Sequence, residues 1–510
     1  MCHRHDAIGS SAYNGRPALT LPPGVSPSDF FYIIPEIVLA IGAMVVLLAD
    51  LYVPREQRGK MISLSVGVVA ATALSVVMIG NPDTTIAGDL MSIDAFGMFF
   101  KLLFLGAAAL TLMMSGSYLT VEDAPAGVYC FLVLSATLGM MFVASGIELI
   151  TIFIGLETMA VAFYILAGYL KPNPRSNEAA VKYFLLGAFS LGILLYGMSL
   201  LYGLTGSTNL HVIATALGDG GENQQLLQLA LILITAGIGF KIAAVPFHMW
   251  APDVYEGAPT PITAFLSVGS KAAAFAMLLR IFVEGLPSVA MYWQQLFEVL
   301  AIVTMVVGNI AAITQNNIKR MLAYSSIAQA GYLLIGVVAG TSRGVTAMLV
   351  YLSVYALMQL GAFAVIIFLR RKDAVGDNLH DFNGLYFRRP FAAIAMLFFM
   401  LSLGGIPPTA GFMGKFWLFG AAIDAGFYRL ALIGVLNSAV SLYYYLRVVV
   451  YMWLKNEPVG SMPQATPALT LTIAVAMIGT LVLGLYPGPL FELAEISASA
   501  LGSVATSVSP

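Results

Sequence analysis

The stretch from residue 231 to residue 271 reads LILITAGIGFKIAAVPFHMWAPDVYEGAPTPITAFLSVGSK. It begins as an apolar helix that carries Lys241, breaks at Pro246, passes through a polar turn, and becomes apolar again before Lys271. A lysine at the centre of a bilayer helix costs about 2.5–3.5 kcal/mol on insertion scales. Two such lysines beside a broken helix therefore indicate function, and we interpret them as parts of a charge-relay path through a membrane.

The composition is typical of a polytopic helical membrane protein. Of the 510 residues, 59% are hydrophobic and only 10% are charged, with a mean hydropathy of +0.88, whereas soluble domains contain about 25% charged residues. The net charge of −2 provides no basic surface for a nucleic acid.

Cofactor signals are missing from the sequence. Cys2 and Cys130 lie too far apart to ligate an iron–sulfur cluster, and the five histidines lack metal-ligand spacing. No glycine-rich nucleotide loop stands between a strand and a helix. We therefore expect neither a metal nor a redox cofactor in this chain.

Apolar segments of span length recur along the whole chain. A span needs about 20 apolar residues, and about fourteen segments qualify, near 31–52, 61–79, 95–118, 126–145, 148–169, 178–204, 226–249, 259–284, 294–314, 321–340, 345–370, 391–424, 427–454 and 466–487. The segment at 391–424 is too long for one straight span and contains Pro407 and Pro408, so we expect it to be interrupted. The fold class is thus all-α, with about fourteen transmembrane helices.

The lysines and arginines of the loops predict the orientation. Taking alternate loops, one side collects Arg55, Arg58, Lys60, Lys171, Arg175, Lys319, Arg320, Arg370, Arg371, Lys372, Arg388, Arg389 and Lys455. This side should face the cytoplasm by the positive-inside rule. The loops at 80–92 and 205–225 contain no lysine or arginine and should lie outside. With an even number of spans, both termini should also lie on the outer, periplasmic side.

Two segments each contain a lysine beside a helix break, and the order of lysine and break is reversed between them. Lys241 precedes the break at Pro246, whereas Lys415 follows the break at Pro407 and Pro408. Inverted repeats with broken helices are typical of transporters. We therefore expect a polar extension over 1–28, three helices over 29–125, a first bundle over 126–284, an inverted second bundle over 285–454, and a final helix with a tail over 455–510.

Five ionisable residues are candidates for the relay. Glu157 lies about nine residues into its helix, near mid-depth. Burial favours the neutral form of a carboxylate, whereas a nearby positive charge favours the ionised form. A Glu157–Lys241 pair whose separation changes could therefore hold and release a proton, although a static ion pair is the structural alternative. Lys182 lies about one turn inside the cytoplasmic end and could instead snorkel to the interface. Lys415 follows a break whose freed backbone groups need water or polar partners, so we expect a hydrated cavity there.

Several strings carry a specific resemblance. GFKIAAVPFHMWAPDVYEGAPTPITAFLSVGSK, NNIKRMLAYSSIAQAGYLLIG and LSLGGIPPTAGFMGKF, supported by RSNEAAVKYFLLGAFSLGILLYG and SLYYYLRVVVYM, are similar to the antiporter-like membrane subunits of proton-pumping NADH-quinone oxidoreductase (respiratory complex I, NDH-1), subunit N above all. The resemblance covers about residues 30–490. It implies fourteen helices in two inverted five-helix repeats, with broken helices 7 and 12.

The resemblance also implies roles for individual residues. Glu157 and Lys241 match the family's switching pair, Lys182 its sixth-helix lysine, Lys271 its central lysine, and Lys415 the lysine that exchanges protons with the outside. Supporting positions are Pro246, His248, Pro407, Pro408 and Gln329; His248 could be a relay group or a polar filler. Many relatives have histidine where this chain has Gln329. Glutamine can orient water but does not titrate.

The resemblance implies a setting as well. The partners would be the neighbouring subunit M, the small subunits K, J and A, and the lipid bilayer of a bacterial inner membrane, with no nucleic acid. NADH, FMN, iron–sulfur clusters and quinone would belong to other subunits. Three alternatives stay open: the plastoquinone-reducing photosynthetic relative, a subunit of a multi-subunit cation/proton antiporter, and a structural scaffold.

Overall fold

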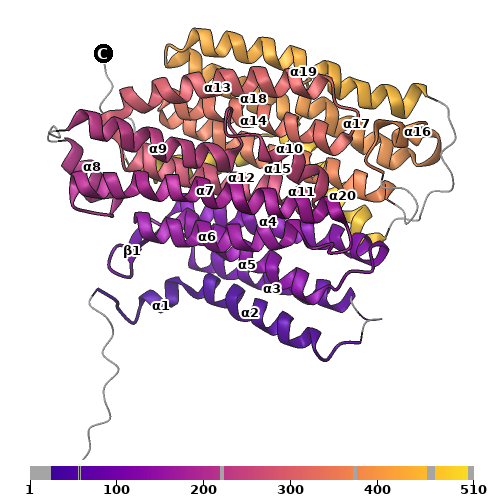
Figure 1. Ribbon diagram of the computed structural model, residues 1–510, viewed down its shortest axis with the longest axis horizontal. Coiled ribbons are helices and arrows are strands. Elements are labelled where there is room, and N and C mark those ends of the chain that lie inside the picture. Colours follow the sequence, from indigo (N-terminus) through magenta and orange to yellow (C-terminus); the bar gives the residue numbers. More distant parts are fainter. Residues whose placement is uncertain are drawn as a thin grey trace, which may run out of the picture.

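The structure is a computed structural model that describes residues 24–54, 57, 59–218, 223–370, 376–455 and 466–502. Helices dominate it and run side by side along the long axis of the molecule (Figure 1). Of the extension expected over 1–28, only residues 24–28 are described.

The first half of the chain contains the following elements: α1 (Asp29–Tyr32), α2 (Ile34–Asp50), α3 (Gly59–Ile79), β1 (Thr84–Ile86), β2 (Met91–Ile93), α4 (Ala95–Val121), α5 (Gly127–Ser145), α6 (Leu149–Ala167), α7 (Pro174–Thr205), α8 (Leu210–Gly218), α9 (Gln224–Ile242), α10 (Trp250–Gly257), α11 (Thr260–Phe265), the π-helical η2 (Leu266–Ser270), α12 (Lys271–Leu278) and the π-helical η3 (Leu279–Glu284). The elements from α11 to η3 form one continuous span, Thr260–Glu284.

The second half contains the 3₁₀ turn η4 (Pro287–Val289), α13 (Ala290–Ile313), α14 (Ile318–Ala339), α15 (Ser342–Leu369), the 3₁₀ turn η5 (Leu379–Phe382), α16 (Leu385–Arg388), α17 (Pro390–Gly404), α18 (Ala410–Asp424), α19 (Tyr428–Leu454), α20 (Pro467–Leu485) and α21 (Gly488–Ser499). Helix α21 was not expected from the sequence, because its 12 residues are too few for a span.

The all-α polytopic fold class is confirmed. Among the described residues, twelve helices are long and apolar enough to cross a membrane. The segment expected at 31–52 corresponds to α2, which has 17 residues. The segment expected at 391–424 is interrupted as anticipated, giving α17 and α18 with 15 residues each. A total of fourteen spans depends on these shorter helices and, like the two inverted repeats, stays a prediction.

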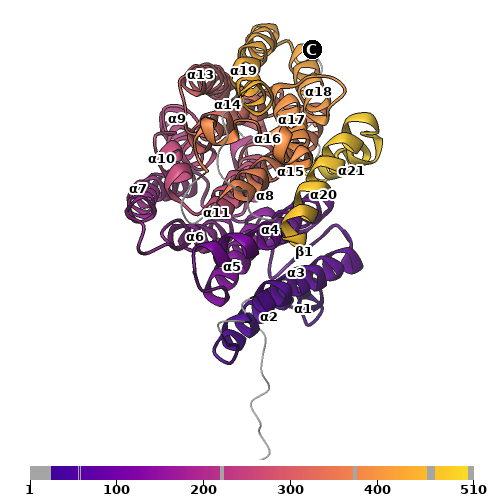
Figure 2. The same cartoon turned by 90° about the vertical axis from the view of Figure 1, so that its right-hand side faces the viewer.

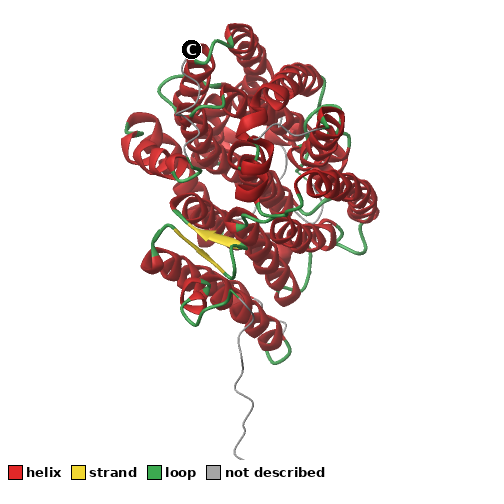
Figure 3. Cartoon of the chain, turned by 90° about the vertical axis from the view of Figure 1, so that its left-hand side faces the viewer, coloured by secondary structure: helices red, strands yellow, loops and turns green. Residues whose placement is uncertain are grey.

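One end of the molecule gathers the loops that the sequence assigns to the outer side. The β1–β2 hairpin lies at this end (Figure 3), and α8 lies there too (Figure 1). The backbone N–H of Ala87 in the hairpin donates to Asp29 of α1 at 3.0 Å. Residues 499–502 line a cavity with Thr84 and His211. The first and the last described residues of the chain therefore lie at the same end of the molecule. That this end is periplasmic stays a prediction.

The most buried helices lie in the middle of the bundle. Nearly all residues of the span Thr260–Glu284, α14 and α15 are buried, whereas only 22–33% of the apolar stretches of α3, α19 and α20 is buried. The end-on view shows α14 and α15 surrounded by other helices, with the α2–α3 pair at the periphery (Figure 2). Charged or polar groups on the central helices are thus shielded from lipid by protein.

Candidate functional site

The two broken helices end with the same backbone motif. At the first break, Ala243 takes the left-handed conformation with φ 59°, and the N–H of Ala244 donates to the carbonyl of Gly239 at 2.8 Å. At the second break, Gly405 has φ 82°, and the N–H of the next residue again reaches back five residues, at 3.0 Å. This is the Schellman motif that terminates many helices. The breaks expected from Pro246 and from Pro407 and Pro408 are confirmed.

Side chains satisfy the backbone groups that the first break frees. The carbonyl of Phe240 accepts the indole N–H of Trp250 at 2.9 Å. The N–H of Val245 donates to Oγ1 of Thr304 at 3.0 Å. Because a freed polar group without a partner is costly at membrane depth, these contacts allow the helix carrying Lys241 to end inside the bundle.

Lys241 lies against α6, the helix of Glu157. Its side chain is buried, and its Nζ lies 3.5 Å from the hydroxyl of Tyr164 and 5.5 Å from the centre of that ring. Glu157 is half-buried, and within the described part of the chain it forms no ion pair with Lys241. The structure therefore places Lys241 against the helix of Glu157 without an ion pair between the two side chains. Sequence reasoning missed Tyr164, although it lies two helical turns after Glu157.

Lys182 lies apart from these residues. Its side chain is 41% exposed and forms ion pairs with Glu178 and Asp253, both at 2.7 Å. Asp253 also pairs with Arg320 at 2.8 Å. Lys182 thus belongs to a charged cluster at the surface, an arrangement that fits the snorkelling alternative; its place in a relay stays a prediction.

Lys271 follows the π-helical turn η2 and faces α14. Its buried Nζ donates to Oγ of Ser326 at 2.6 Å and also contacts the carbonyl of that residue. The hydroxyl of Tyr355 on α15 donates to the same Oγ at 2.9 Å. Lys271, in the segment expected to form the first bundle, is therefore directed towards helices α14 and α15 of the expected second bundle.

The side chain of Lys415 binds a backbone carbonyl that the second break frees. Its buried Nζ donates to the carbonyl of Leu403 and to Oγ of Ser438, both at 3.0 Å, and lies 4.5 Å from the centre of the Tyr332 ring. Oγ of Ser438 in turn donates to the carbonyl of Gly404 at 3.2 Å. The freed carbonyls, for which we expected a hydrated cavity, thus have protein partners.

Gln329 shares an acceptor with Lys415. Its Nε2 donates to the carbonyl of Leu403 and to the hydroxyl of Tyr445, both at 3.2 Å, while its Oε1 accepts a hydrogen bond from Tyr351. The hydroxyl of Tyr445 also bonds Oγ of Ser325 at 2.5 Å. Because the carbonyl of Leu403 also binds Lys415, Gln329 connects this network to the second break.

These contacts form two hydrogen-bonded groups that meet at the adjacent residues Ser325 and Ser326, and together we call them the buried polar ladder. Its members are Ser325, Ser326 and Gln329 of α14, Tyr351 and Tyr355 of α15, and Tyr445 of α19. Each of these side chains is buried. Sequence reasoning found only Gln329. The spacing of three and four residues along α14 and of four along α15 was the available signal, because such residues share one helix face.

The remaining supporting residues lie at the edges of the breaks. Pro246, Pro407 and Pro408 are exposed, and His248 is half-buried. In the part of the chain that the structure describes, no hydrogen bond joins His248 to Lys241, Lys271 or Lys415. The prolines are thus placed to shape the breaks, while a relay role for His248 stays a prediction.

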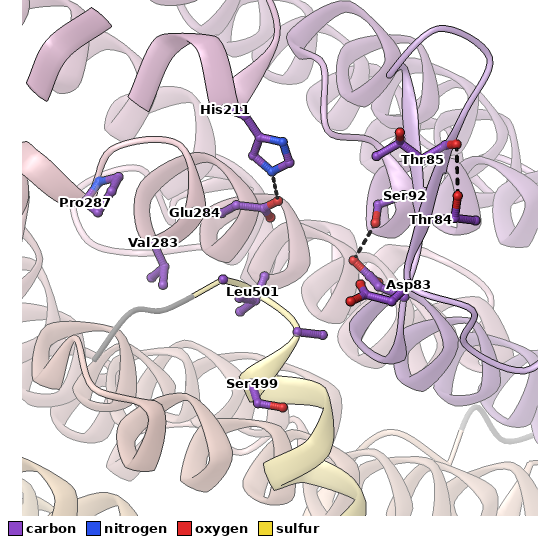
Figure 4. A pocket seen from close by; sticks show the side chains of 13 residues that line it. Asp83, Thr84, Thr85, Ser92, His211, Val283, Glu284, Pro287, Ser499 and Leu501 are labelled. Carbon is purple, nitrogen blue, oxygen red and sulfur yellow. Dashed lines mark hydrogen bonds and ion pairs between the residues drawn. The ribbon is translucent and has the colours of Figure 1, made fainter. Parts of the chain in front are cut away.

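A polar cavity of about 450 Å³ opens at the hairpin end of the molecule (Figure 4). It is lined by Asp83, Asp94, His211 and Glu284 among others, and His211 contacts Glu284 at 2.9 Å. None of the site residues expected from the sequence lines it. The cavity is therefore separate from the buried lysines.

A polytopic bundle with two interrupted helices and buried lysines defines the class of antiporter-like membrane subunits. Residues 146–441 match the family described as NADH:quinone oxidoreductase/Mrp antiporter, transmembrane. The chain is 46% identical to NADH-quinone oxidoreductase subunit N of Trichlorobacter lovleyi, over 91% of this chain and 96% of the relative. It is 44% identical to NAD(P)H-quinone oxidoreductase subunit 2 of a Synechococcus strain, over 90% of this chain and 89% of the relative.

A solved structure has the same fold. A chain of respiratory complex I from Thermus thermophilus with bound aureothin superposes with a TM-score of 0.78 at 34% identity, over 90% of this chain and 99% of that one. The protein belongs to the NADH:quinone oxidoreductase/Mrp antiporter family, and within it to the subunit N branch of NADH-quinone oxidoreductase.

Proposed function

We propose that this chain is a proton-translocating membrane-arm subunit of a bacterial NADH-quinone oxidoreductase. It moves protons through Glu157, Lys241, Lys271 and Lys415. One observation carries the proposal: Lys271 and Lys415 are both buried, and both contact the buried polar ladder or the carbonyl that the ladder binds.

The chemistry follows from what the lysines touch. Lys241, Lys271 and Lys415 contact hydroxyl or carbonyl oxygens, and among the described residues none of the three forms an ion pair with a carboxylate. A buried ammonium without a carboxylate partner is costly. Its protonation therefore responds to small changes around it, such as the approach of Glu157 to Lys241 or a change in hydration.

The setting of the chain is part of the proposal. Redox energy reaches it from other subunits that hold NADH, FMN, iron–sulfur clusters and quinone, and this chain binds none of them. Its neighbours are the antiporter-like subunit M and the small subunits K, J and A. The complex lies in the bacterial inner membrane, with both termini of this chain on the periplasmic side. The names of the relatives support this setting.

The test is Lys271→Ala in the native complex in sealed membranes. After assembly is checked, NADH-driven quinone reduction and proton translocation are recorded together. We expect both to fall about tenfold, which corresponds to about 1.4 kcal/mol, and Lys241→Ala to act in the same direction. Lys171→Ala, which removes an exposed lysine, is the matched control and should leave both rates unchanged.

Normal reduction and pumping in an assembled Lys271→Ala complex would refute the relay. Sodium-dependent proton exchange without any redox donor would instead favour the cation/proton antiporter. If neutral substitutions at Glu157, Lys241, Lys271 and Lys415 together leave turnover and pumping intact, the chain is a scaffold.

A further inference from the structure

Tyr445 occupies the junction of the buried polar ladder. Its side chain is 1% exposed. Its hydroxyl bonds Oγ of Ser325 at 2.5 Å and accepts the Nε2 proton of Gln329 at 3.2 Å. Ser325 precedes Ser326, which binds Lys271, and Gln329 binds the carbonyl that Lys415 also binds. Tyr445 thus shares Gln329 with the surroundings of Lys415, and its partner Ser325 is adjacent in the chain to the residue that binds Lys271.

Gln329 is unsuited to carry the proton itself. Its amide donates to Leu403 and Tyr445 and accepts from Tyr351, and an amide does not titrate near neutral pH. A hydroxyl, in contrast, can accept a proton on one lone pair while it releases its own, and so stays neutral. Among the described groups that contact Gln329, the hydroxyl of Tyr445 is the one that also contacts Ser325, the residue before Ser326 in α14.

We propose that the hydroxyl of Tyr445 carries the proton past Gln329 between Lys271 and Lys415. This step rests on the proposed relay. An N–H bond of the Lys271 ammonium breaks and an O–H bond forms at Ser326, which releases its own proton to a water molecule. The water passes a proton to Ser325, Ser325 passes one to Tyr445, and Tyr445 releases its proton through a second water to the neutral amine of Lys415. Lys271 loses one proton, Lys415 gains one, and each hydroxyl ends neutral.

The neighbouring tyrosine provides a matched control. Tyr444 is also fully buried on α19, but its hydroxyl donates to Oδ1 of Asn309 at 2.9 Å. Asn309 lies on α13 and bonds Asn437 at 3.3 Å. Removing the hydroxyl of Tyr444 therefore removes a buried hydrogen bond to α13 from a ring whose centre lies 4.4 Å from that of Tyr445, so it controls for the loss of a neighbouring buried hydroxyl.

The experiment compares Tyr445→Phe, Tyr444→Phe, Gln329→His and Tyr445→Phe/Gln329→His in assembled complex in sealed membranes. Proton translocation and NADH-driven quinone reduction are measured together. We expect Tyr445→Phe to lower both at least about tenfold, since an acid–base group contributes about that much or more, and Tyr444→Phe to change them less than about twofold. Gln329→His should restore most of the loss in the double variant, because an imidazole titrates near neutral pH and can carry the proton.

Two results would overturn the inference: normal pumping in Tyr445→Phe, or a loss that Tyr444→Phe equals and that Gln329→His does not restore. The second would mean that Tyr445 serves only packing. Lys271→Ala in the same preparation separates the two proposals. If Lys271→Ala abolishes pumping while Tyr445→Phe does not, the role of Tyr445 fails and the relay stands; if both are normal, both fail.

Discussion

At the scale of single residues, the buried lysines of this chain are of two kinds. Lys101 pairs with Glu36 at 2.7 Å, and both side chains are buried, which is the static ion pair that structural stability alone would require. Lys271 and Lys415 instead contact only hydroxyl or carbonyl oxygens in the described part of the chain. Lys319 is also buried and donates to the carbonyls of Glu256 and Ala258 at 2.8 Å, so contacts of the second kind do not by themselves identify a proton-exchanging lysine.

His211 should make stability depend on pH. The hydrogen bond to Glu284 raises the pKa of His211 above its ordinary value near 6.5. Its contribution to stability is therefore fully present below about pH 6.5 and is lost as pH rises through the raised value. Because the side chain is 56% exposed, we expect an effect of at most about 1 kcal/mol.

The measurement is the thermal unfolding midpoint of the complex as a function of pH, with His211→Gln as the control. The wild type should be more stable than His211→Gln at acidic pH, and the difference should vanish under alkaline conditions. A difference that is independent of pH would contradict the assignment, because it would show that the hydrogen bond contributes without the charge.

At the scale of elements, the two broken helices solve the same problem with different residues. Both end in a Schellman motif, one with Ala243 and one with Gly405 in the left-handed conformation. Trp250 and Thr304 satisfy the backbone at the first break, while Lys415 and Ser438 do so at the second. At the second break Lys415 is thus itself part of the helix end, so its movement would change the break.

Gly411 should tolerate no side chain. A Cβ at this first turn of α18 would lie 1.8 Å from the carbonyl oxygen of Ser402 at the end of α17. We expect Gly411→Ala to push the half-helices apart and to destabilise the subunit by about 1–3 kcal/mol. Gly420→Ala on the same helix is the control, since its Cβ would meet only Arg343, at 3.8 Å, and alanine favours a helix by about 0.5–1 kcal/mol.

Complex content in membranes and the thermal inactivation midpoint check this prediction. Gly411→Ala should lower both relative to the wild type, and Gly420→Ala should lower neither. Equal midpoints for the two variants would show that the junction of α17 and α18 can open without cost.

At the scale of the whole molecule, buried ion pairs connect α4, near the N-terminus, to the central span. Arg280 of the span Thr260–Glu284 pairs with Asp94 at 2.7 Å and with Glu284 at 2.8 Å. Asp94 caps the start of α4 by accepting the N–H of Gly97 at 2.7 Å. One network thus joins the start of α4 to the span that carries Lys271.

Removing the charge of Asp94 should therefore weaken the assembly. Asp94→Asn leaves the guanidinium of Arg280 buried with one carboxylate fewer, and breaking a buried pair costs about 3–5 kcal/mol. Asp424→Asn breaks the ion pair with Arg343, in which the Asp424 side chain is 50% exposed and the Arg343 side chain 60%. This change should cost less than about 1 kcal/mol. Urea or thermal unfolding of the purified complex distinguishes the two. If Asp94→Asn lowers the free energy of unfolding no more than Asp424→Asn does, the buried network does not stabilise the contact between α4 and the central span.

Local chemistry explains what the sequence by itself determined. Long apolar runs require helices in a bilayer, and proline with glycine interrupts them, so the fold class and both breaks follow from residues close together in the chain. The cost of burying a charge in an apolar helix is likewise a local property, and it is sufficient to single out Lys241, Lys271 and Lys415.

Only the tertiary structure decided what these groups touch. Ser325 and Tyr445 are 120 positions apart, and Lys271 and Ser326 are 55 apart. No local pattern specifies such pairings, because they depend on how the helices pack. The same holds for Lys182, which meets Asp253 at the surface 71 positions away, and for Tyr445, which belongs to a run of three tyrosines of which Tyr443 faces outwards and Tyr444 and Tyr445 are buried. Successive residues on a helix point in different directions, so packing alone selects which tyrosine reaches Gln329.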